Sequence, residues 1–455
     1  MNVMQSGAQT IARSATLPKE MRCEPAARRL RIALAFSRVP FPMMRGDQLT
    51  VAHLISFYRA RGHVVDLYTL DVQGRMRPEQ DAWLRESCRR VNIYPHGMTT
   101  RIAGGLRGLL RRQPVQVGMF HNPHLRADLL AATQRGEYDI IHCYYMRTAP
   151  DIPVDLTLGR DGRVPPGARA ASFLALQLSQ SLNTRRLRDN ETSWARRMFY
   201  KLEADLCASF EARAWQGFTR SVLIGPADVA ALEDLCRTQH QPNIDNWVYG
   251  AHGTDTDRFQ PAVPDEIVPG RVVFSGSRLY QPNIQAVLWF VEHCWSAVRK
   301  ACPSAELVVQ GRDPAPAVQA LHGKDGITVT GTVPEVGAII RSSAVCINPV
   351  LAAAGMQNKL IEYMASNKAI VATSVANEGI LAPSDTLLIA DDAGAFAQAV
   401  IELLADPDRA IALGNRARSY VVEHWSWEAH FLKLEAEFLK ALDHPSVLAA
   451  DAGDS

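Results

Sequence analysis

The chain has 455 residues, of which 47% are hydrophobic and 21% charged, and its formal net charge is +2. This composition is ordinary for a globular protein, and it lacks the strongly basic field expected of a nucleic-acid-binding protein. The length favours more than one domain, since single hydrophobic cores rarely grow beyond about 250–300 residues.

Targeting and metal-binding signals are missing from the sequence. The eight cysteines form no C-x-x-C pair and have no histidine at zinc spacing, which favours free thiols in a reducing compartment. Residues 1–29 lack the apolar region of a secretory signal and are predicted to be a disordered tail. No apolar run approaches the roughly 18 residues of a membrane span. These features predict a cytoplasmic protein with no metal site.

The first half of the chain reads as a series of parallel strands and helices. The apolar run 30–36 predicts a buried strand, a helix follows at 49–61, and a second strand follows at 63–68. Further strands are predicted at 138–143, 170–179 and 221–224, with a long helix at 193–216. This pattern is the start of a doubly wound α/β domain.

The second half repeats the scheme. Strands are predicted at Arg271–Ser275, 305–309, 327–330, 344–348, 369–373 and 387–389, and helices at 283–300 and 355–366. Gly, Pro and Asp concentrate at 243–264, which indicates a domain boundary. The sequence therefore predicts two facing Rossmann-like domains, at 30–243 and 244–424, with ligands bound at the carboxyl ends of the strands.

The end of the chain is predicted to return to the N-terminal domain. Residues 425–443 have the pattern of an amphipathic helix, and 444–455 read as a loose tail. Trp425 and Trp427 suggest the return, because exposed aromatic side chains at a chain end need a partner surface.

The segment NPVLAAAGMQNKLIEYMASNKAI at 348–370 carries the strongest chemical signal. A strand ends, a loop of small residues follows, and a helix opens near Gly355, an arrangement that suits a phosphate group. Lys359 and Glu362 share one helix face, so they could contact a diphosphate and a ribose. The same spacing also fits an ordinary surface ion pair.

This segment, G-x-x-x-K-x-x-E-x-M-A followed by AIVATS, resembles the donor-site helix of retaining family 4 glycosyltransferases, which have the GT-B fold. The segments FSGSRLYQPN, VQGR, VTGTVP and GTDTDRF fit the same family. The resemblance implies a nucleotide-diphosphate sugar as donor substrate, no cofactor, and a catalytic role for Lys359. The donor-binding residues that it implies are Gly276, Ser277, Arg278, Gly311, Arg312, Gly331, Val333, Gly355, Lys359 and Glu362.

The opening SRVPFPMMRGDQLT, with GMQNKLIEYMA and QGRDPAPAVQAL, is more narrowly similar to sugar transferases associated with exosortase and PEP-CTERM exopolysaccharide systems. This resemblance implies a role in bacterial surface glycan assembly, with a glycan or lipid-linked acceptor.

The chain departs from the family pattern at three positions. Counting back from Glu362 places Ala354 where many members have the first carboxylate of E-x7-E, and Ser277 and Pro282 replace a family Arg and Lys. The phosphate charge would then be met by Lys359, Arg278 or Arg45. These gaps leave two alternatives open, namely a non-catalytic nucleotide-sugar-binding partner and a sugar-nucleotide epimerase.

Two N-terminal features complete the predicted site. In the resembling family, the loop at Arg45, Gly46 and Asp47 contacts donor phosphate or acceptor, although a tight turn with an Asp cap explains it equally well. His142 and Tyr144 stand where the family often has H-x-H near the reacting sugar. We predict that both are catalytic and that Arg147 joins the phosphate loop, whereas a lone histidine at a strand end can also be structural.

Two further segments have competing interpretations. Asp255-Thr256-Asp257 matches a D-x-D metal motif, but its place in the linker favours a structural or capping role. The stretch 100–113 combines four arginines with apolar residues and no acid. It would either rest on anionic lipid, giving a peripheral contact with the cytosolic face of the inner membrane, or form a basic helix over the core.

Overall fold

The computed structural model describes residues 17–443 except 19, 22, 44–45, 73–75, 178, 190, 192, 251–252, 277–280, 312–313, 334 and 352–355. The described residues belong to two compact units, one drawn from Ala15–Ala251 with Phe431–Ser455 and the other from His252–His430. Among them, no helix combines the length and the apolarity that a bilayer crossing needs.

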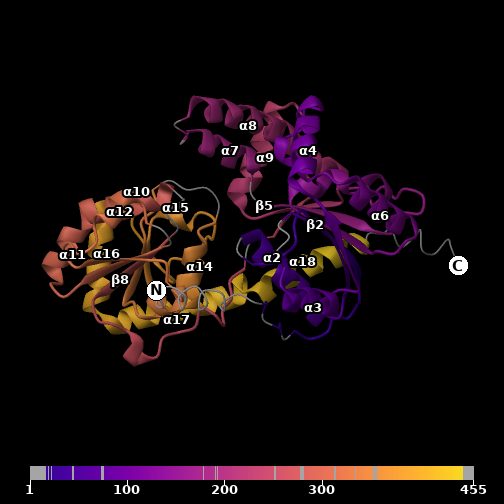
Figure 1. The fold of residues 1–455 in the computed structure, drawn as a ribbon. Coiled ribbons are helices and arrows are strands. Elements are labelled where there is room, and N and C mark those ends of the chain that lie inside the picture. The colour runs from indigo at the N-terminus through magenta and orange to yellow at the C-terminus, as the bar shows by residue number, and fades with distance from the viewer. Residues whose placement is uncertain are drawn as a thin grey trace, which may run out of the picture. The chain divides into compact units, whose positions relative to one another are not determined.

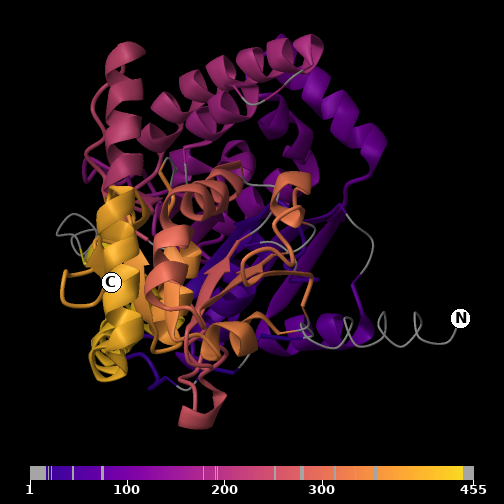
Figure 2. The same cartoon turned by 90° about the vertical axis from the view of Figure 1, so that its left-hand side faces the viewer.

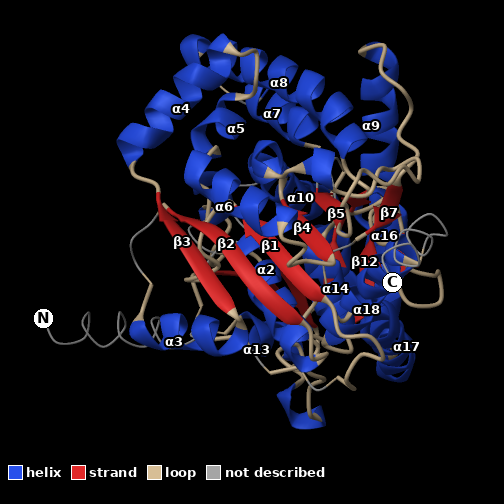
Figure 3. Ribbon diagram, turned by 90° about the vertical axis from the view of Figure 1, so that its right-hand side faces the viewer, coloured by secondary structure: helices blue, strands red, loops and turns tan. Residues whose placement is uncertain are grey.

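The N-terminal unit is a parallel sheet of seven strands in the order β3-β2-β1-β4-β5-β6-β7, with helices on both faces (Figures 1 and 3). Its strands are β1 (Arg31–Phe36), β2 (Val64–Asp71), β3 (Arg90–Pro95), β4 (Ile140–Tyr144), β5 (Ala171–Gln177), β6 (Arg220–Leu223) and β7 (Trp247–Tyr249). Its helices are α2 (Gly46–Ala60), α3 (Pro78–Ser87), α4 (Met98–Leu110), α5 (Val115–Phe120), α6 (Pro123–Gln134), α7 (Gln180–Asp189), α8 (Trp194–Ala214) and α9 (Pro226–Thr238). The strand order reverses between β1 and β4, which are parallel neighbours.

The C-terminal unit is a second parallel sheet, of six strands in the order β10-β9-β8-β11-β12-β13. Its strands are β8 (Arg271–Ser275), β9 (Glu306–Gln310), β10 (Ile327–Gly331), β11 (Val345–Asn348), β12 (Ala369–Ala372) and β13 (Leu388–Ile389). Its helices are α10 (Gln281–Phe290), α11 (Ser296–Ala301), α12 (Pro316–Gln319), α13 (Val336–Arg341), α14 (Asn358–Ala365), α15 (Ser374–Asn377), α16 (Ala393–Ala405) and α17 (Pro407–Trp425). A π-helical turn at Val291–Trp295 joins α10 to α11. The predicted pair of Rossmann-like sheets is confirmed.

The terminal helix α18 (Trp427–Leu442) returns to the N-terminal unit as predicted, but different side chains carry the contact. Phe438 packs against Phe173, His142 and Tyr58, with ring centres 4.6, 5.6 and 6.2 Å away. Glu435 binds Arg61 at 2.8 Å and His63 at 2.5 Å. The predicted role of the tryptophans was wrong, because Trp425 ends α17 and Trp427 covers Gly253 in the C-terminal unit.

Truncating this anchor should destabilise the N-terminal unit. Phe438 is fully buried, so Phe438→Ala is expected to lower the free energy of unfolding by about 3–5 kcal/mol. Leu432 lies on the same helix but is exposed, and Leu432→Ala should change the free energy by less than about 0.5 kcal/mol. Urea unfolding of both variants checks this, and equal losses would show that α18 is not anchored through Phe438.

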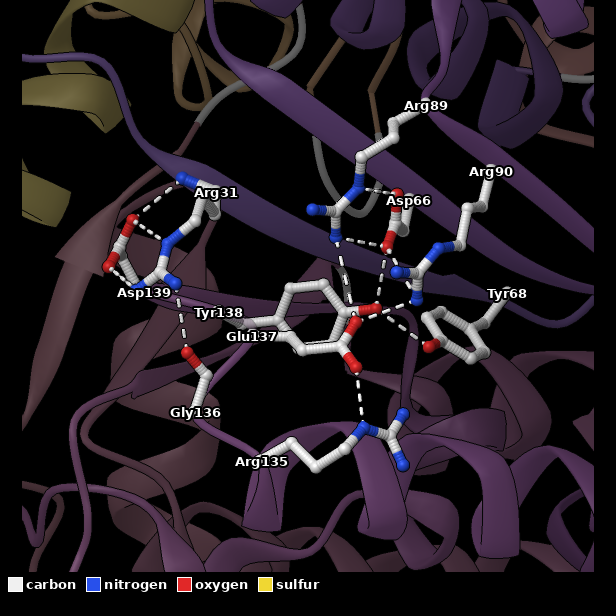
Figure 4. Close-up of polar contacts among 10 residues, drawn as sticks. All are labelled: Arg31, Asp66, Tyr68, Arg89, Arg90, Arg135, Gly136, Glu137, Tyr138 and Asp139. Carbon is white, nitrogen blue, oxygen red and sulfur yellow. Dashed lines mark hydrogen bonds and ion pairs between the residues drawn. The ribbon is translucent and has the colours of Figure 1, made fainter.

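A polar network ties the amino ends of the N-terminal strands together (Figure 4). Buried Asp66 on β2 accepts hydrogen bonds from Arg89 at 2.6 Å and from the Tyr138 hydroxyl at 2.8 Å, and Tyr138 meets Tyr68 at 2.7 Å. The remaining ion pairs are Arg90–Glu137, Arg135–Glu137 and Arg31–Asp139. This network lies at the edge opposite to the carboxyl ends of the strands, so its role is structural.

Several boundaries differ from the sequence prediction. The edge strands β3 and β7 were not predicted, because they are half-exposed and have no buried apolar run. Part of the predicted N-terminal tail is attached to the fold, since Ala26 N–H bonds to the Arg61 carbonyl at 2.9 Å and Arg28 pairs with Asp443 at 3.1 Å. The predicted terminal helix is interrupted at Ser426, which caps α18 through Ala429 N–H.

Candidate functional site

The carboxyl edge of the C-terminal sheet gathers the predicted donor residues that the structure describes. The strand order reverses between β8 and β11, and open α/β sheets bind ligands at such a reversal. Gly276 follows β8, Gly311 follows β9, and α14 comes shortly after β11. Helix α14 begins at Asn358, three residues later than the predicted start at Gly355.

Lys359 is buried at this edge without a carboxylate partner among the described residues. Its Nζ donates to Asn283 Oδ1 at 2.5 Å, lies 3.5 Å from Asn348 Oδ1, and sits 4.7 Å from the centre of the Phe274 ring. Burial lowers its pKa to about 7, and the negative charge of Glu362 opposes that shift. A buried ammonium with neutral oxygen partners favours an incoming anion, because the anion would restore the charged form.

Glu362 lies one turn further along α14, beside a cation that sequence reasoning missed. Burial raises the pKa of this carboxyl group, while the positive charges of Arg258 and Lys359 lower it. The backbone of Arg258 is held by Asp255, whose Oδ1 accepts hydrogen bonds from the N–H groups of Asp257 and Arg258 at 3.1 and 3.0 Å. The linker motif GTDTDRF contained Arg258, but its spacing did not indicate that the arginine lies near Glu362.

The same two hydrogen bonds give the D-x-D segment a capping role, as predicted. Among the residues that the structure describes, no group of three His, Cys, Asp or Glu side chains is placed to hold a metal ion.

Two predicted glycines let the loops of this edge close on each other. A Cβ on Gly311 would lie 2.0 Å from the Gly276 carbonyl oxygen, and one on Gly276 would lie 2.9 Å from the Asn283 side chain. Both glycines, with Phe274 and Asn283, line a pocket between β8, β9 and α10. The packing around Gly276 therefore allows Asn283 to reach Lys359.

The remaining predicted donor residues either lie at the end of β10 and in the loop after it or fall outside the described residues. Gly331 ends β10 with a φ of +67°, which favours glycine, and Val333 lies in the loop that follows. Ser277, Arg278, Arg312, Gly355 and Arg45 lie outside the described residues.

In the N-terminal unit, His142 and Tyr144 lie in the core. They are 1% and 3% exposed, respectively, because β4 is a central strand covered on both faces. Burial lowers the pKa of His142 to about 3 and raises that of Tyr144. His142 Nδ1 meets the Tyr58 hydroxyl at 3.0 Å, and its ring also faces Phe438. This burial favours a structural role for both side chains, and the predicted catalytic roles stay predictions.

The burial of His142 has a consequence for acid stability. The folded protein keeps this ring neutral down to about pH 3, whereas the unfolded chain protonates it below about pH 6.5. His142 therefore costs the folded protein no stability above about pH 6.5. Below that pH, the free energy of unfolding falls by up to about 1.4 kcal/mol per pH unit, because the unfolded chain binds a proton that the folded chain does not.

We expect His142→Asn to flatten this dependence, since the amide oxygen can still accept from Tyr58 but does not titrate. Unfolding measured between pH 7 and pH 5 checks this. An unchanged slope would assign the acid sensitivity to other groups.

The predicted loop after β1 is described from Gly46 onward. Gly46 begins α2, and Asp47 accepts a hydrogen bond from Gln48 N–H at 3.0 Å and lies 3.6 Å from Arg38. Arg147 lies on the ring of Tyr145 at 4.7 Å and of Phe120 at 5.1 Å. Asp47 therefore lies in the first turn of α2 close to Arg38, while Arg147 is held in place beside aromatic rings.

Comparison with known proteins identifies the C-terminal fold. Residues 269–406 match the family model of group 1 glycosyl transferases. An uncharacterized 44.6 kDa protein in the cps region of Klebsiella pneumoniae is 20% identical over 418 residues, covering 90% of this chain and 99% of that protein.

Solved structures extend the likeness to nearly the whole chain. Sucrose-phosphate synthase from Thermosynechococcus elongatus is 18% identical with a TM-score of 0.58, covering 90% of this chain and 99% of its own. Anabaena Alr3699/HepE in complex with UDP is 14% identical with a TM-score of 0.55, covering 90% and 100%. The same Anabaena protein has also been solved with UDP-glucose. These matches show the GT-B fold.

Proposed function

Because the chain is a group 1 glycosyltransferase with the GT-B fold, we propose that it transfers a sugar from a nucleoside-diphosphate sugar, with retention of configuration and without a metal ion. The observation that carries this proposal is the buried ammonium of Lys359, which lies among neutral partners at the strand ends beside Glu362.

The two side chains of α14 would bind different parts of the donor. Lys359 would neutralise the diphosphate, and its charge would count most in the transition state, when the leaving group becomes more negative. Glu362 would accept hydrogen bonds from the ribose hydroxyls, with the positive charges of Arg258 and Lys359 favouring the ionised carboxylate against the effect of burial.

The transfer step needs no nucleophilic side chain. Ala354 stands where a carboxylate could have attacked the sugar, so we propose that the acceptor hydroxyl attacks on the face from which the diphosphate departs. The new glycosidic bond forms as the bond to the diphosphate breaks. The departing phosphate oxygen takes the acceptor proton, so no general base is required.

The relatives suggest the biological setting. The Klebsiella relative is named for its place in the cps region, and the Anabaena structures contain UDP and UDP-glucose. Together with the sequence resemblance to exosortase-associated transferases, this supports a uridine nucleotide donor and a role in bacterial exopolysaccharide or surface glycan assembly.

The N-terminal unit carries a surface suited to an anionic bilayer. Helix α4 packs on α5 through Gly104, Gly105 and Gly108, which meet Gly118 and Met119. Its other face exposes a stripe of large apolar side chains, and the start of α8 adds a second exposed group. The two groups are Met98, Ile102, Leu106 and Leu110 on α4 and Trp194, Met198, Phe199 and Leu202 on α8.

Basic side chains border these apolar groups, including Arg107, Arg196 and Lys201. In Figures 1, 2 and 3, α4, α7 and α8 lie at the same end of their unit. Exposed apolar residues beside basic ones favour the interface of anionic lipids. We propose a peripheral contact there, on the cytosolic face of the inner membrane, which would bring the enzyme to a lipid-linked acceptor.

Incubation of the purified chain with UDP-, GDP- and dTDP-sugars tests the chemistry. Slow release of a nucleoside diphosphate and a sugar of retained configuration supports the transferase, and inversion would contradict the mechanism. Conversion of one nucleotide sugar into another would support an epimerase. Binding without turnover, even with membrane extracts as a source of acceptor, would support a non-catalytic partner.

Co-sedimentation with lipid vesicles tests the membrane contact. We expect binding to phosphatidylglycerol vesicles at low salt, loss of that binding in Leu106→Asp and Trp194→Asp, and no effect of Leu381→Asp. Leu381 is a matched control because it is equally exposed but belongs to the C-terminal unit. Equal effects of all three substitutions would contradict the assignment.

A further inference from the structure

Three guanidinium groups of the N-terminal unit surround one aromatic ring. The guanidinium carbons of Arg38, Arg101 and Arg147 lie 5.8, 5.5 and 5.1 Å from the centre of the Phe120 ring. Arg38 follows β1, Arg101 lies on α4 after β3, and Arg147 follows β4. Arg38 and Arg147 thus come from the carboxyl ends of the two strands that flank the reversal of the sheet order, where such sheets bind ligands, and Arg101 joins them from the helix that follows the edge strand β3.

Arg147 is held rigidly in this cluster. Its guanidinium lies on the Tyr145 ring as well as the Phe120 ring, and its Nε donates to Gln116 Oε1 at 3.2 Å. Tyr145 adopts a φ of 84°, which is unusual for a residue with a side chain. Strained backbone of this kind costs stability and recurs at ligand sites, because it fixes a functional side chain in position.

The positive charge of the cluster is poorly balanced. Arg38 lies 3.6 Å from Asp47, but no carboxylate among the described residues lies within ion-pair distance of Arg101 or Arg147. The buried Nε of Arg101 has no hydrogen-bond partner in the part of the chain that the structure describes. Buried polar groups are almost always paired, so an unpaired donor beside uncompensated cations indicates a missing anionic partner.

A buried histidine that stacks on the Phe120 ring also supports a missing partner at this cluster. His96 is 1% exposed and stacks on Phe120, with ring centres 6.2 Å apart. Its Nε2 donates to the Met119 carbonyl at 2.7 Å, whereas its buried Nδ1 has no partner among the described residues.

From this geometry we propose that Arg38, Arg101 and Arg147 form an anion subsite that binds a phosphate or diphosphate group carried by the sugar acceptor. The planar, forked guanidinium group suits phosphate oxygens better than a single ammonium does. Reading the anion as part of the acceptor rests on the proposed transferase function, since the donor diphosphate is assigned to Lys359 of the other unit.

Calorimetric titration of the full chain with inorganic pyrophosphate, in the presence of excess UDP, tests the subsite. Each of Arg101→Gln and Arg147→Gln should weaken binding at least about tenfold, as expected for a lost charge-assisted hydrogen bond. Arg237→Gln is the control, because Arg237 lies on α9 of the same unit, is exposed and belongs to neither proposed binding surface, and it should change the affinity less than about twofold. Arg101→Lys retains the charge and the fold, and should recover part of the affinity.

Competition experiments identify the source of the phosphate. Displacement of pyrophosphate by farnesyl diphosphate in phosphatidylcholine vesicles supports a lipid diphosphate acceptor, and displacement by glucose 1-phosphate supports a soluble sugar phosphate. The subsite is overturned if the parent chain does not bind pyrophosphate, or if Arg237→Gln weakens binding as much as Arg101→Gln. UDP binding is measured separately. If the chain binds UDP but does not bind pyrophosphate, the subsite is refuted while the proposed transferase function is not.

Discussion

Lys359→Met is expected to lower kcat/KM for sugar transfer by about 10²–10³-fold, the loss typical of removing one charge-stabilising donor from a transition state. The variant keeps the length of the side chain but cannot neutralise the leaving diphosphate. The buried ammonium is held by Asn283 and Asn348 and lies over Phe274, so its position is set before the substrate arrives.

Lys368→Met provides the matched control. Lys368 is the second strongly buried lysine described in the C-terminal unit, but its Nζ donates to the backbone carbonyls of Ser343 and Arg341. Its replacement should therefore lower stability and leave kcat/KM unchanged. Steady-state kinetics on both variants, compared at a temperature where both are folded, would contradict the assignment if the two losses were equal.

The pH dependence of donor binding gives an independent readout of Lys359. Burial places its pKa near 7 in the free protein, and a bound diphosphate would raise it. Donor binding should then take up a proton, and affinity should fall as the pH rises above about 7. Calorimetry in buffers of different ionisation heat measures the proton uptake, which should disappear in Lys359→Met.

Glu362→Gln is expected to weaken donor binding by about 10–100-fold, because one or two hydrogen bonds from ribose to a charged acceptor become neutral ones. Comparing UDP with 2′,3′-dideoxy-UDP isolates this effect. The parent protein should prefer UDP strongly, and Glu362→Gln should bind the two nucleotides nearly equally.

Glu402→Gln is the control, because it removes an exposed carboxylate of α16. This variant should still prefer UDP over 2′,3′-dideoxy-UDP, as the parent protein does. If Glu362→Gln retains that preference as well, the carboxylate does not contact the ribose.

The sequence predicted the central strands well because each is a buried apolar run, such as RVVFS in β8 and the run that ends β4. The edge strands β3 and β7 lack that signal, since one or both of their faces are half-exposed. The same buried character that identified β4 also places His142 in the core. A strand covered on both faces places a polar residue in the core as readily as at a ligand site.

The candidate site was only partly predictable. Lys359 and Glu362 were found because they share one helix and a fixed spacing. Arg258, Asn283 and Asn348 were not, because their contact with α14 depends on tertiary packing between segments far apart in the chain. The cluster around Phe120 was not predicted for the same reason, since its arginines come from three separate connections of the sheet; Arg147 was assigned to the phosphate loop, and Arg101 was noted only as part of the basic stretch 100–113.

The central claim is that the buried cation at the C-terminal strand ends binds the diphosphate of a nucleotide-sugar donor. A thermal-shift panel of uridine, guanosine and thymidine diphosphates and their sugars, run on the parent chain and on Lys359→Met, tests it most directly. At about a hundred times its dissociation constant, a true ligand adds about 2.7 kcal/mol to the stability of the parent chain. We predict such a shift for at least one nucleotide, most simply a uridine nucleotide, and its loss in Lys359→Met. Absence of a shift across the whole panel, or an equal shift in the variant, would contradict the account.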